Sequence, residues 1–375
     1  MRILITGNMG YLGPVVVRRL RQSYPDATLV GFDMGYFAGC LTAPEVFPEC
    51  RVDLQYFGDV RNLSDEVLQH VDVVVHLAAI SNDPMGSTFA DVTFEVNHRA
   101  SIHVAKLAKE AGVRSFVFAS SCSVYGNCEG EAKTENDPVS PLTPYAKSKV
   151  MTEQDLSLMA EKTFAVTCLR FATACGMSDR LRLDLVLNDF IASALACGSI
   201  TILSDGTPRR PLIHVCDVAR AIEWGVLRES SEGGEFLVVN VGSDNLNFQL
   251  KDLADAVAKA IPHVGVSVNK HAQPDKRSYR VNFAKFAELA PDYAPEIGLQ
   301  AAIDDMKDGL TAIKFSDPNF RDSKFIRLNI MNHLKATHCL SDNIEWIHST
   351  HMPAPAIPGN GQPRSRPVRE EQPVT

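Results

Sequence analysis

Three residues in the first half of the chain have the types and spacing that proton transfer from a hydroxyl group needs. Tyr145 and Lys149 are four residues apart, so on a helix their side chains share one face. A free tyrosine has a pKa of about 10, too high for a base at neutral pH, and a neighbouring ammonium group favours the phenolate and lowers that pKa. Ser121 offers a hydroxyl that could hold a substrate oxygen while its proton moves. A tyrosine and a lysine at this spacing are also common on ordinary helix surfaces, so the pair alone decides little.

A second group, near the N-terminus, has the pattern of a dinucleotide-binding turn. Gly7, Gly10 and Gly13 follow a short apolar run and open a helix-like segment. Gly7 permits a tight turn, Gly10 lets the backbone approach a pyrophosphate, and Gly13 lets the helix pack on the strand. The helix N-terminus then offers free N–H groups and the positive end of its dipole to phosphates. Asp33, at the end of the next apolar run, could accept hydrogen bonds from ribose hydroxyls and would repel a 2′-phosphate, which favours NAD over NADP. Alternatively, Asp33 is an ordinary turn residue that contacts no ligand.

The elements that must position these groups alternate between short apolar runs and amphipathic stretches. The runs predict buried strands at Arg2–Thr6, Thr28–Asp33, Val71–Leu77, Ser115–Ser120, Phe164–Leu169 and Phe236–Val241. The stretches between them predict helices at Gly13–Ser23, Val96–Ala111, Pro144–Glu161 and Leu250–Ala260. Such alternation predicts an α/β fold with a doubly wound parallel sheet of the Rossmann type and a smaller, mixed C-terminal substrate lobe. Residues 58–60 and 76–79 then also lie at the carboxyl edge of the sheet, where such folds bind ligands.

The length of 375 residues suits two associated units. We expect an NAD-binding domain over residues 1–175, with later segments, about 210–245, returning to it. Residues 176–350 would form the substrate lobe and a C-terminal extension. Residues 351–375, rich in proline and charge, have too few apolar side chains to offset the entropy of ordering, so we expect a disordered tail.

Composition excludes several other classes of function. A net charge of −8 argues against a general nucleic-acid binder. The nine cysteines contain no Cys-x-x-Cys pair, which indicates a reducing compartment and predicts no metal site. No apolar stretch is long enough for a membrane span, and the N-terminus lacks the pattern of a signal peptide. We therefore expect a soluble, cytoplasmic protein.

Taken together, these motifs resemble the extended short-chain dehydrogenase/reductases, and specifically the NAD-dependent nucleotide-sugar epimerase/dehydratase family. The resemblance covers about residues 1–290. It depends on the glycine turn, on residues 58–60, 76–79, 120–126 and 145–149, and on residues 210–218. These motifs are highly specific for the superfamily and poorly specific for the substrate.

The resemblance implies a role for each matching residue. Ser121, Tyr145 and Lys149 match the catalytic trio, and Tyr145 and Lys149 also contact the cofactor. The other implied cofactor contacts are Gly7, Gly10, Tyr11, Leu12 and Gly13 at the pyrophosphate, Asp33 at the ribose, Asp59 and Val60 at the adenine, and Leu77, Ala78, Ala79, Ser81 and Asn97 toward the nicotinamide. The implied contacts with a nucleotide-diphosphate sugar are Ser121, Ser123, Thr173, Arg210 and Arg277, of which Arg277 has the less typical flanking residues.

Departures from the family pattern narrow the chemistry. The 4,6-dehydratases carry an acidic pair where this chain has Cys122 and Ser123, and the decarboxylases usually carry a glutamate at the position of Ser123. Both reactions therefore lose support. Residues 169–177 have Thr173, Cys175 and Met177 in place of the usual motif, which leaves the sugar contacts open. The extension from about 295 to 348 is absent from ordinary epimerases, and its sequence suggests no function.

The leading hypothesis is an NAD-dependent nucleotide-sugar epimerase, acting at C4 by transient hydride transfer through a keto-sugar intermediate. The main alternative is an NAD(P)-dependent 4-keto nucleotide-sugar reductase or dehydrogenase, which uses the same trio. A non-catalytic, NAD-sensing protein is a minor alternative, because such proteins commonly lose the tyrosine or the lysine. The family also implies a homodimer formed through the helices predicted at residues 97–111 and 145–161, whose amphipathic pattern core packing explains equally well.

Overall fold

A computed structural model describes residues 1–43, 47–128, 130–269 and 277–347. The tail predicted to be disordered, residues 351–375, lies outside the described residues. Among the described residues, none of the helices combines the length and apolarity that a membrane crossing needs.

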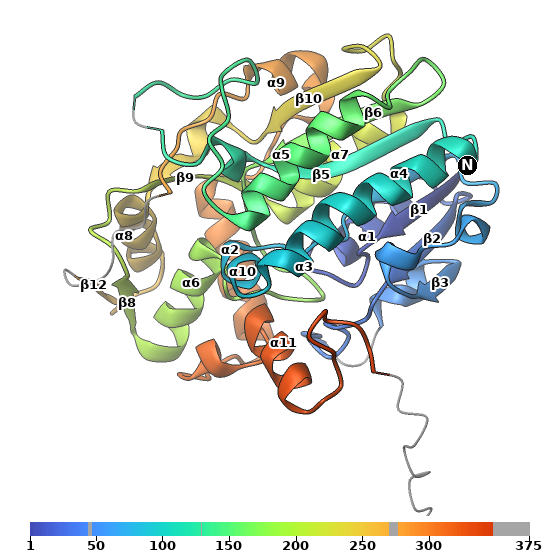
Figure 1. The fold of residues 1–375 in the computed structure, drawn as a ribbon. Coiled ribbons are helices and arrows are strands. Elements are labelled where there is room, and N and C mark those ends of the chain that lie inside the picture. Colours follow the sequence, from blue (N-terminus) through green and yellow to red (C-terminus); the bar gives the residue numbers. More distant parts are fainter. Residues whose placement is uncertain (44–46, 129, 270–276, 348–375) are drawn as a thin grey trace, which may run out of the picture.

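A seven-stranded parallel sheet forms the centre of the molecule (Figure 1). Its strand order is β10-β6-β5-β4-β1-β2-β3, which reverses direction between β1 and β4. The strands are β1 (Arg2–Thr6), β2 (Thr28–Asp33), β3 (Leu54–Phe57), β4 (Val73–His76), β5 (Ser115–Ser121), β6 (Ala165–Phe171) and β10 (Phe236–Val241). The carboxyl ends of these strands meet at one edge of the sheet, and the order reverses beside the glycine turn, where doubly wound folds bind their ligands.

Helices cover both faces of this sheet, which explains why its strands are apolar throughout. In β1, Ile3 and Ile5 pack into the core under α1 and α7, while Leu4 packs into the core on the opposite face under α4 and α5. All three side chains are fully buried. The helices around the sheet are α1 (Gly13–Ser23), α2 (Asp83–Thr88), α3 (Ala90–Phe94), α4 (Ser101–Glu110), α5 (Pro144–Ser157), α7 (Val215–Leu227) and α9 (Ala284–Leu289).

A smaller lobe has its own apolar core and two small sheets. One sheet pairs β7 (Thr173–Cys175), β9 (Arg209–His214) and β11 (Asn247–Gln249), and the other pairs β8 (Ser199–Ile202) with β12 (Gly265–Val268). The lobe's helices are α6 (Val186–Cys197), α8 (Leu250–Ala260) and α10 (Leu299–Ala312). The predicted fold class, a doubly wound sheet with a smaller mixed lobe, is thus confirmed. Of the segments expected to return to the large sheet, α7 and β10 do so, whereas β9 lies in the small sheet.

The C-terminal extension returns to the first half of the chain. Helix α11 (Arg327–Ala336), orange in Figure 1, lies below α2 and α3. Met331, Leu340 and Ile344 of the extension share an apolar core with Met85 and Phe89. The extension therefore packs against the edge of the sheet where the motifs gather.

Candidate active site

One large cavity, of about 570 Å³, runs along the carboxyl edge of the main sheet into the smaller lobe. Most of the residues predicted from the sequence line it: Gly7, Gly10, Tyr11, Leu12, Asp33, Asp59, Val60, Leu77, Ala78, Ala79, Ser81, Ser121, Ser123, Tyr145, Lys149, Thr173, Arg210 and Arg277. Gly13 and Asn97 do not line it. Residues from the two halves of the chain thus contribute to one space, of a size typical for sites that bind small ligands.

The glycine turn between β1 and α1 cannot accommodate side chains at two of its positions. Gly7 has a φ of +74°, and a Cβ there would lie 2.6 Å from the backbone nitrogen of Ala78. A Cβ on Gly13 would lie 2.1 Å from the carbonyl oxygen of Asn8, so Gly13 serves the packing of α1 and not the cavity wall. No side chain caps the N-terminus of α1, which leaves its backbone N–H groups available to a phosphate. This cradle fits the pyrophosphate of a dinucleotide.

Asp33 and Asp59 line the same end of the cavity, and both are held by local hydrogen bonds. Asp33 accepts hydrogen bonds from the backbone N–H groups of Met9, at 3.0 Å, and Gly35, at 2.7 Å. Burial raises the pKa of Asp33, and these two N–H groups oppose that shift. Asp59 accepts from the Arg61 backbone at 2.9 Å and from its guanidinium Nε at 2.8 Å. Both carboxylates are therefore fixed in place at the end of the cavity where the adenosine part of a dinucleotide is expected.

Asn97 acts on the cavity from behind its wall. It is fully buried, accepts a hydrogen bond from the Ile80 backbone N–H at 2.7 Å and donates to the Ile80 carbonyl at 3.0 Å. It lies in η4 (Glu95–Ala100), a π-helical segment inserted between α3 and α4. Such segments often occur at functional sites. Asn97 thus fixes the backbone of Ile80, which follows β4 and directly precedes Ser81 in the cavity wall.

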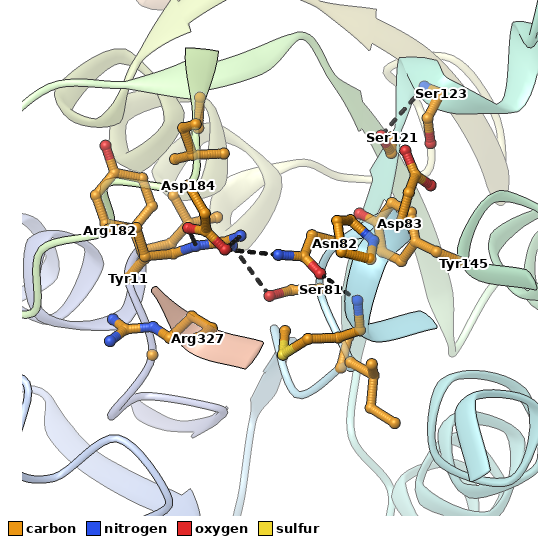
Figure 2. A pocket seen from close by; sticks show the side chains of 18 of the residues that line it. Tyr11, Ser81, Asn82, Asp83, Ser121, Ser123, Tyr145, Arg182, Asp184 and Arg327 are labelled. Carbon is orange, nitrogen blue, oxygen red and sulfur yellow. Dashed lines mark hydrogen bonds and ion pairs between the residues drawn. The ribbon is translucent and has the colours of Figure 1, made fainter. Parts of the chain in front are cut away.

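Ser121, Tyr145 and Lys149 meet where β5 ends and α5 begins. Thr143 caps α5 by accepting a hydrogen bond from the Ala146 backbone N–H at 3.2 Å, and Pro144 occupies the first turn. Tyr145 therefore stands at the start of the helix, toward Ser121 and Asp83 (Figure 2). One turn later, Lys149 is almost fully buried and donates to the Ala119 carbonyl at 2.7 Å.

Burial has the largest effect on the pKa values of both Tyr145 and Lys149. It raises the pKa of Tyr145 to about 12, and hydrogen bonding with Ser121 opposes the shift. Burial also lowers the pKa of Lys149 to about 8. The Lys149 ammonium lies 5.7 Å from the centre of the Tyr145 ring and is held by a carbonyl. The expected lowering of the tyrosine pKa by Lys149 is therefore wrong, because the cost of burying a phenolate raises this pKa instead.

The residues expected at the substrate end also lie on the cavity. The hydroxyl of Ser123 is buried and has no hydrogen-bond partner among the described residues, so a bound ligand could supply one. Arg210 donates to the Arg209 carbonyl at 2.8 Å and to that of Arg277, and its guanidinium lies 5.6 Å from the ring centre of Tyr279. Arg277 forms an ion pair with Asp83.

Sequence reasoning missed Asp83, which follows β4 and begins α2. Its carboxylate accepts a hydrogen bond from the Thr143 hydroxyl at 2.5 Å and pairs with Arg277. Its negative charge contributes to the raised pKa of Tyr145. The signal was available, because the sequence from Asn82 to Pro84 is a typical helix start directly after a predicted strand. A carboxylate therefore does lie beside the trio, although the chain has none directly after Ser121.

Sequence reasoning also missed a polar network opposite Tyr145 (Figure 2). Arg182 pairs with Asp184 at 2.8 Å and donates to the Ser81 hydroxyl at 3.1 Å. Asn82 donates to Asp184 at 2.6 Å. The segment that holds Arg182 and Asp184 alternates leucine with charged residues, yet the polar partners that connect this ion pair to the cavity, Ser81 and Asn82, lie about a hundred positions away. Arg327, from the extension, lines the same side and had no local signal.

Comparisons with known proteins agree with this geometry. Residues 3–242 match the model of the NAD dependent epimerase/dehydratase family. The low-salt glycan biosynthesis protein Agl12 of Haloferax volcanii is 27% identical over 314 residues, which cover 81% of this chain and 98% of that protein. An uncharacterized UDP-glucose epimerase of Bacillus subtilis, YtcB, is 29% identical over 64% of this chain and 77% of its own length. Among solved structures, MoeE5 in complex with UDP-glucuronic acid and NAD superposes with a TM-score of 0.70 at 25% identity, over 83% of this chain and 99% of that one.

Proposed function

Because the chain belongs to the NAD-dependent epimerase/dehydratase family, we propose that it is a nucleotide-sugar epimerase that inverts C4 of the sugar through a keto intermediate. The observation that carries this proposal is the single cavity that joins the glycine turn to Tyr145 and Ser121 and continues to Arg210 and Arg277. It provides adjoining spaces for a dinucleotide and for the diphosphate of a second nucleotide. The solved structure named above, MoeE5, is in complex with UDP-glucuronic acid and NAD, which supports this proposal.

In this mechanism the arginines bind and the trio moves the proton. Arg210 and Arg277 hold the diphosphate of the nucleotide sugar, and Ser121 donates a hydrogen bond to the sugar hydroxyl that reacts. Tyr145 accepts the proton of that hydroxyl and later returns it. NAD, held by the glycine turn, Asp33 and Lys149, would supply the reversible hydride transfer at the sugar ring, and its positive charge would favour the phenolate of Tyr145.

We expect Lys149 to assist both cofactor binding and the proton transfer by Tyr145. Its ammonium is fixed on the Ala119 carbonyl at the end of β5, within one helical turn of Tyr145. From there it can hydrogen-bond a ribose hydroxyl at the nicotinamide end and stabilise the phenolate from a distance. Burial raises the pKa of Tyr145 to about 12, so this proposal requires further positive charge beside the phenol to favour the phenolate.

A second candidate reaction, elimination of water from the sugar, is favoured by Asp83. Its carboxylate lies beside Tyr145 and could remove a carbon-bound proton if it left Arg277. The absence of acidic side chains at Cys122 and Ser123 favours epimerisation. Cys122 is buried with its thiol donating to the Arg170 carbonyl, which keeps it away from the cavity.

The test is to incubate the purified protein with UDP-glucose, UDP-galactose and UDP-glucuronic acid in D₂O and to follow the sugars by proton NMR. We expect the C4 epimer of one of them, without deuterium in the ring and without net consumption of NAD. Deuterium at C5 together with a keto-deoxy sugar would instead establish the elimination. Turnover that requires stoichiometric NADH or NAD⁺ would establish the reductase or dehydrogenase alternative.

Two further predictions concern the assembly and the division of the chain. We propose a homodimer formed through the outer sides of α4 and α5, near the point where His98 of η4 and Asp155 of α5 lie 2.7 Å apart. Sedimentation velocity of the wild type against a variant with an added charge on each helix tests it. A monomer at micromolar concentration would contradict the proposal.

The boundary near residue 175 remains a prediction that limited proteolysis can test.

A further inference from the structure

Arg327 is a buried cation that forms no ion pair with a carboxylate of the described residues. Its side chain is 1% exposed, and its Nη1 has no hydrogen-bond partner among the described residues. Its Nη2 donates to the carbonyl of Arg180 at 2.9 Å, and its guanidinium lies 4.6 Å from the ring centre of Phe37. A buried charge of this kind is costly unless an anion or a full set of hydrogen bonds compensates it.

The neighbouring charges compensate it only in part: Asp184 favours the charge of Arg327, but its carboxylate already pairs with Arg182. Arg180 and Arg182 both lie close enough to disfavour the charge of Arg327, and each already pairs with a carboxylate of its own, Glu49 or Asp184. Burial lowers the pKa of Arg327 to about 10, which still leaves the guanidinium charged at neutral pH. The cavity that Arg327 lines is therefore the place where a compensating anion can bind.

The position of Arg327 in the cavity indicates which anion this is. Arg327 lies on the same side as Tyr11, which belongs to the glycine turn (Figure 2). Phe37, on which it packs, follows the carboxyl end of β2 and Asp33. The arginines expected to bind the nucleotide sugar, Arg210 and Arg277, pack around Tyr279 and Asp83 instead. An anion beside Arg327 would therefore lie close to the glycine turn, where the diphosphate of a dinucleotide is expected.

The segment after α11 continues over the adenosine end of the same cavity. The Trp346 indole N–H donates to the Met34 carbonyl at 2.7 Å, and Arg61 donates to the Asn343 carbonyl at 2.9 Å. The rings of Trp346 and Tyr36 lie 5.5 Å apart. Between these contacts, Ile344 is 2% exposed and lines the cavity. Residues 340–347 are therefore tied to the loops that follow Asp33 and Asp59.

We propose that Arg327 is a cofactor-binding residue whose guanidinium neutralises the diphosphate of NAD, and that residues 340–347 retain the adenosine end. The proposal rests on the proposed function only in placing NAD on the glycine turn. It gives the C-terminal extension a role, and it makes NAD a bound group that stays on the protein between turnovers, as an epimerase requires.

The test compares Arg327→Gln and Arg327→Lys with the control His333→Gln, a change at an exposed position of the same helix outside the cavity. NAD content after gel filtration is measured by HPLC, and the affinities for ADP-ribose and UDP are measured by calorimetry on nucleotide-free protein. For Arg327→Gln we expect NAD to be lost and the ADP-ribose affinity to fall by about tenfold or more, with UDP affinity unchanged. Arg327→Lys should keep part of the affinity, and His333→Gln all of it.

Unchanged ADP-ribose affinity in a folded Arg327→Gln protein would overturn the proposal, and so would a loss confined to UDP. If Arg327→Gln does not fold, Trp346→Phe removes a single N–H donor at the same end. Its NAD should dissociate at least threefold faster, and an unchanged rate would count against the retaining role. If the variants lose turnover but all of them bind ADP-ribose normally, this proposal is contradicted and the proposed function stands. If the variants lose ADP-ribose affinity as expected but the wild type has no epimerase activity, this proposal stands and the proposed function is contradicted.

Discussion

The two sides of the cavity are built in different ways. One, here called the strand-end side, comprises the glycine turn, Ser121, Tyr145 and Lys149, and each part directly follows a strand or begins a helix of the main sheet. The other, here called the arginine side, consists of Arg182, Arg210, Arg277 and Arg327, which come from distant segments. The first is held mainly by backbone geometry, and the second by ion pairs and carbonyl groups.

This difference separates chemistry from recognition. Groups that move a proton must be positioned within fractions of an ångström, and regular elements hold side chains more rigidly than returning segments do. Groups that bind a diphosphate act through charge and tolerate more variation. We therefore expect substitutions on the strand-end side to reduce turnover or abolish cofactor binding, and substitutions on the arginine side to weaken ligand binding in a graded way.

The largest effect is expected for Tyr145→Phe, which removes only the phenolic oxygen. Loss of a general base typically costs 10²–10⁴-fold, so we expect kcat to fall by about 10³-fold while NAD content stays the same. Epimer formation measured by NMR, with NAD content by HPLC, checks it. Tyr56→Phe, on the exposed edge strand β3, is the control and should keep full activity. A Tyr145→Phe protein within tenfold of the wild type would contradict the role of the strand-end side.

Gly7→Ala should give the next largest effect, because it strains the turn and displaces the strand end beside it. The positive φ costs about 1–3 kcal/mol for a non-glycine residue, and the new Cβ would collide with the Ala78 backbone. We expect the affinity for ADP-ribose to fall by more than about tenfold, together with a lower melting temperature. Gly39→Ala is the control, since no atom lies within 4 Å of its added Cβ. Equal affinity in both variants would show that the turn does not bind the cofactor.

On the arginine side, Arg210→Gln should raise the KM for the nucleotide sugar by about tenfold and change kcat by less than about threefold. The reason is that Arg210 binds the diphosphate in the ground state and the transition state alike. Steady-state kinetics with the sugar identified by the NMR screen checks it. Arg209→Gln, its neighbour in β9, does not line the cavity and serves as the control. A fall in kcat with unchanged KM would place Arg210 with the chemistry instead.

The same contrast explains how much of the site the sequence could predict. β1, β2 and β10 and helices α1 and α8 have the predicted bounds, because each has a local apolar pattern whose residues pack into the core. Tyr145 and Ser121 could be found because spacing along one helix or strand end determines where they point. Arg182 and Arg327 could not, since nothing near them in the chain indicates that Ser81 or the Arg180 carbonyl will be their partners. The pKa of Tyr145 was predicted in the wrong direction because burial is a tertiary property.

The smallest effect concerns Lys149 and appears in stability. Its pKa is about 8 in the folded protein and about 10.4 in an unfolded chain, so between these values the unfolded chain holds a proton that the folded protein has released. The free energy of unfolding contributed by Lys149 therefore rises with pH, by about 1.4 kcal/mol per pH unit in this window, and is reduced at neutral pH. Relative to Lys149→Met, which lacks this titration, the wild type should gain about 2 kcal/mol between pH 8 and 10.

Urea unfolding at pH 7, 8, 9 and 10 measures the difference, and Lys147→Met, an exposed neighbour on α5, should show no such trend. A constant difference between wild type and Lys149→Met across this range would mean that Lys149 is not desolvated, and the strand-end side would then lack the buried cation that supports the phenolate of Tyr145.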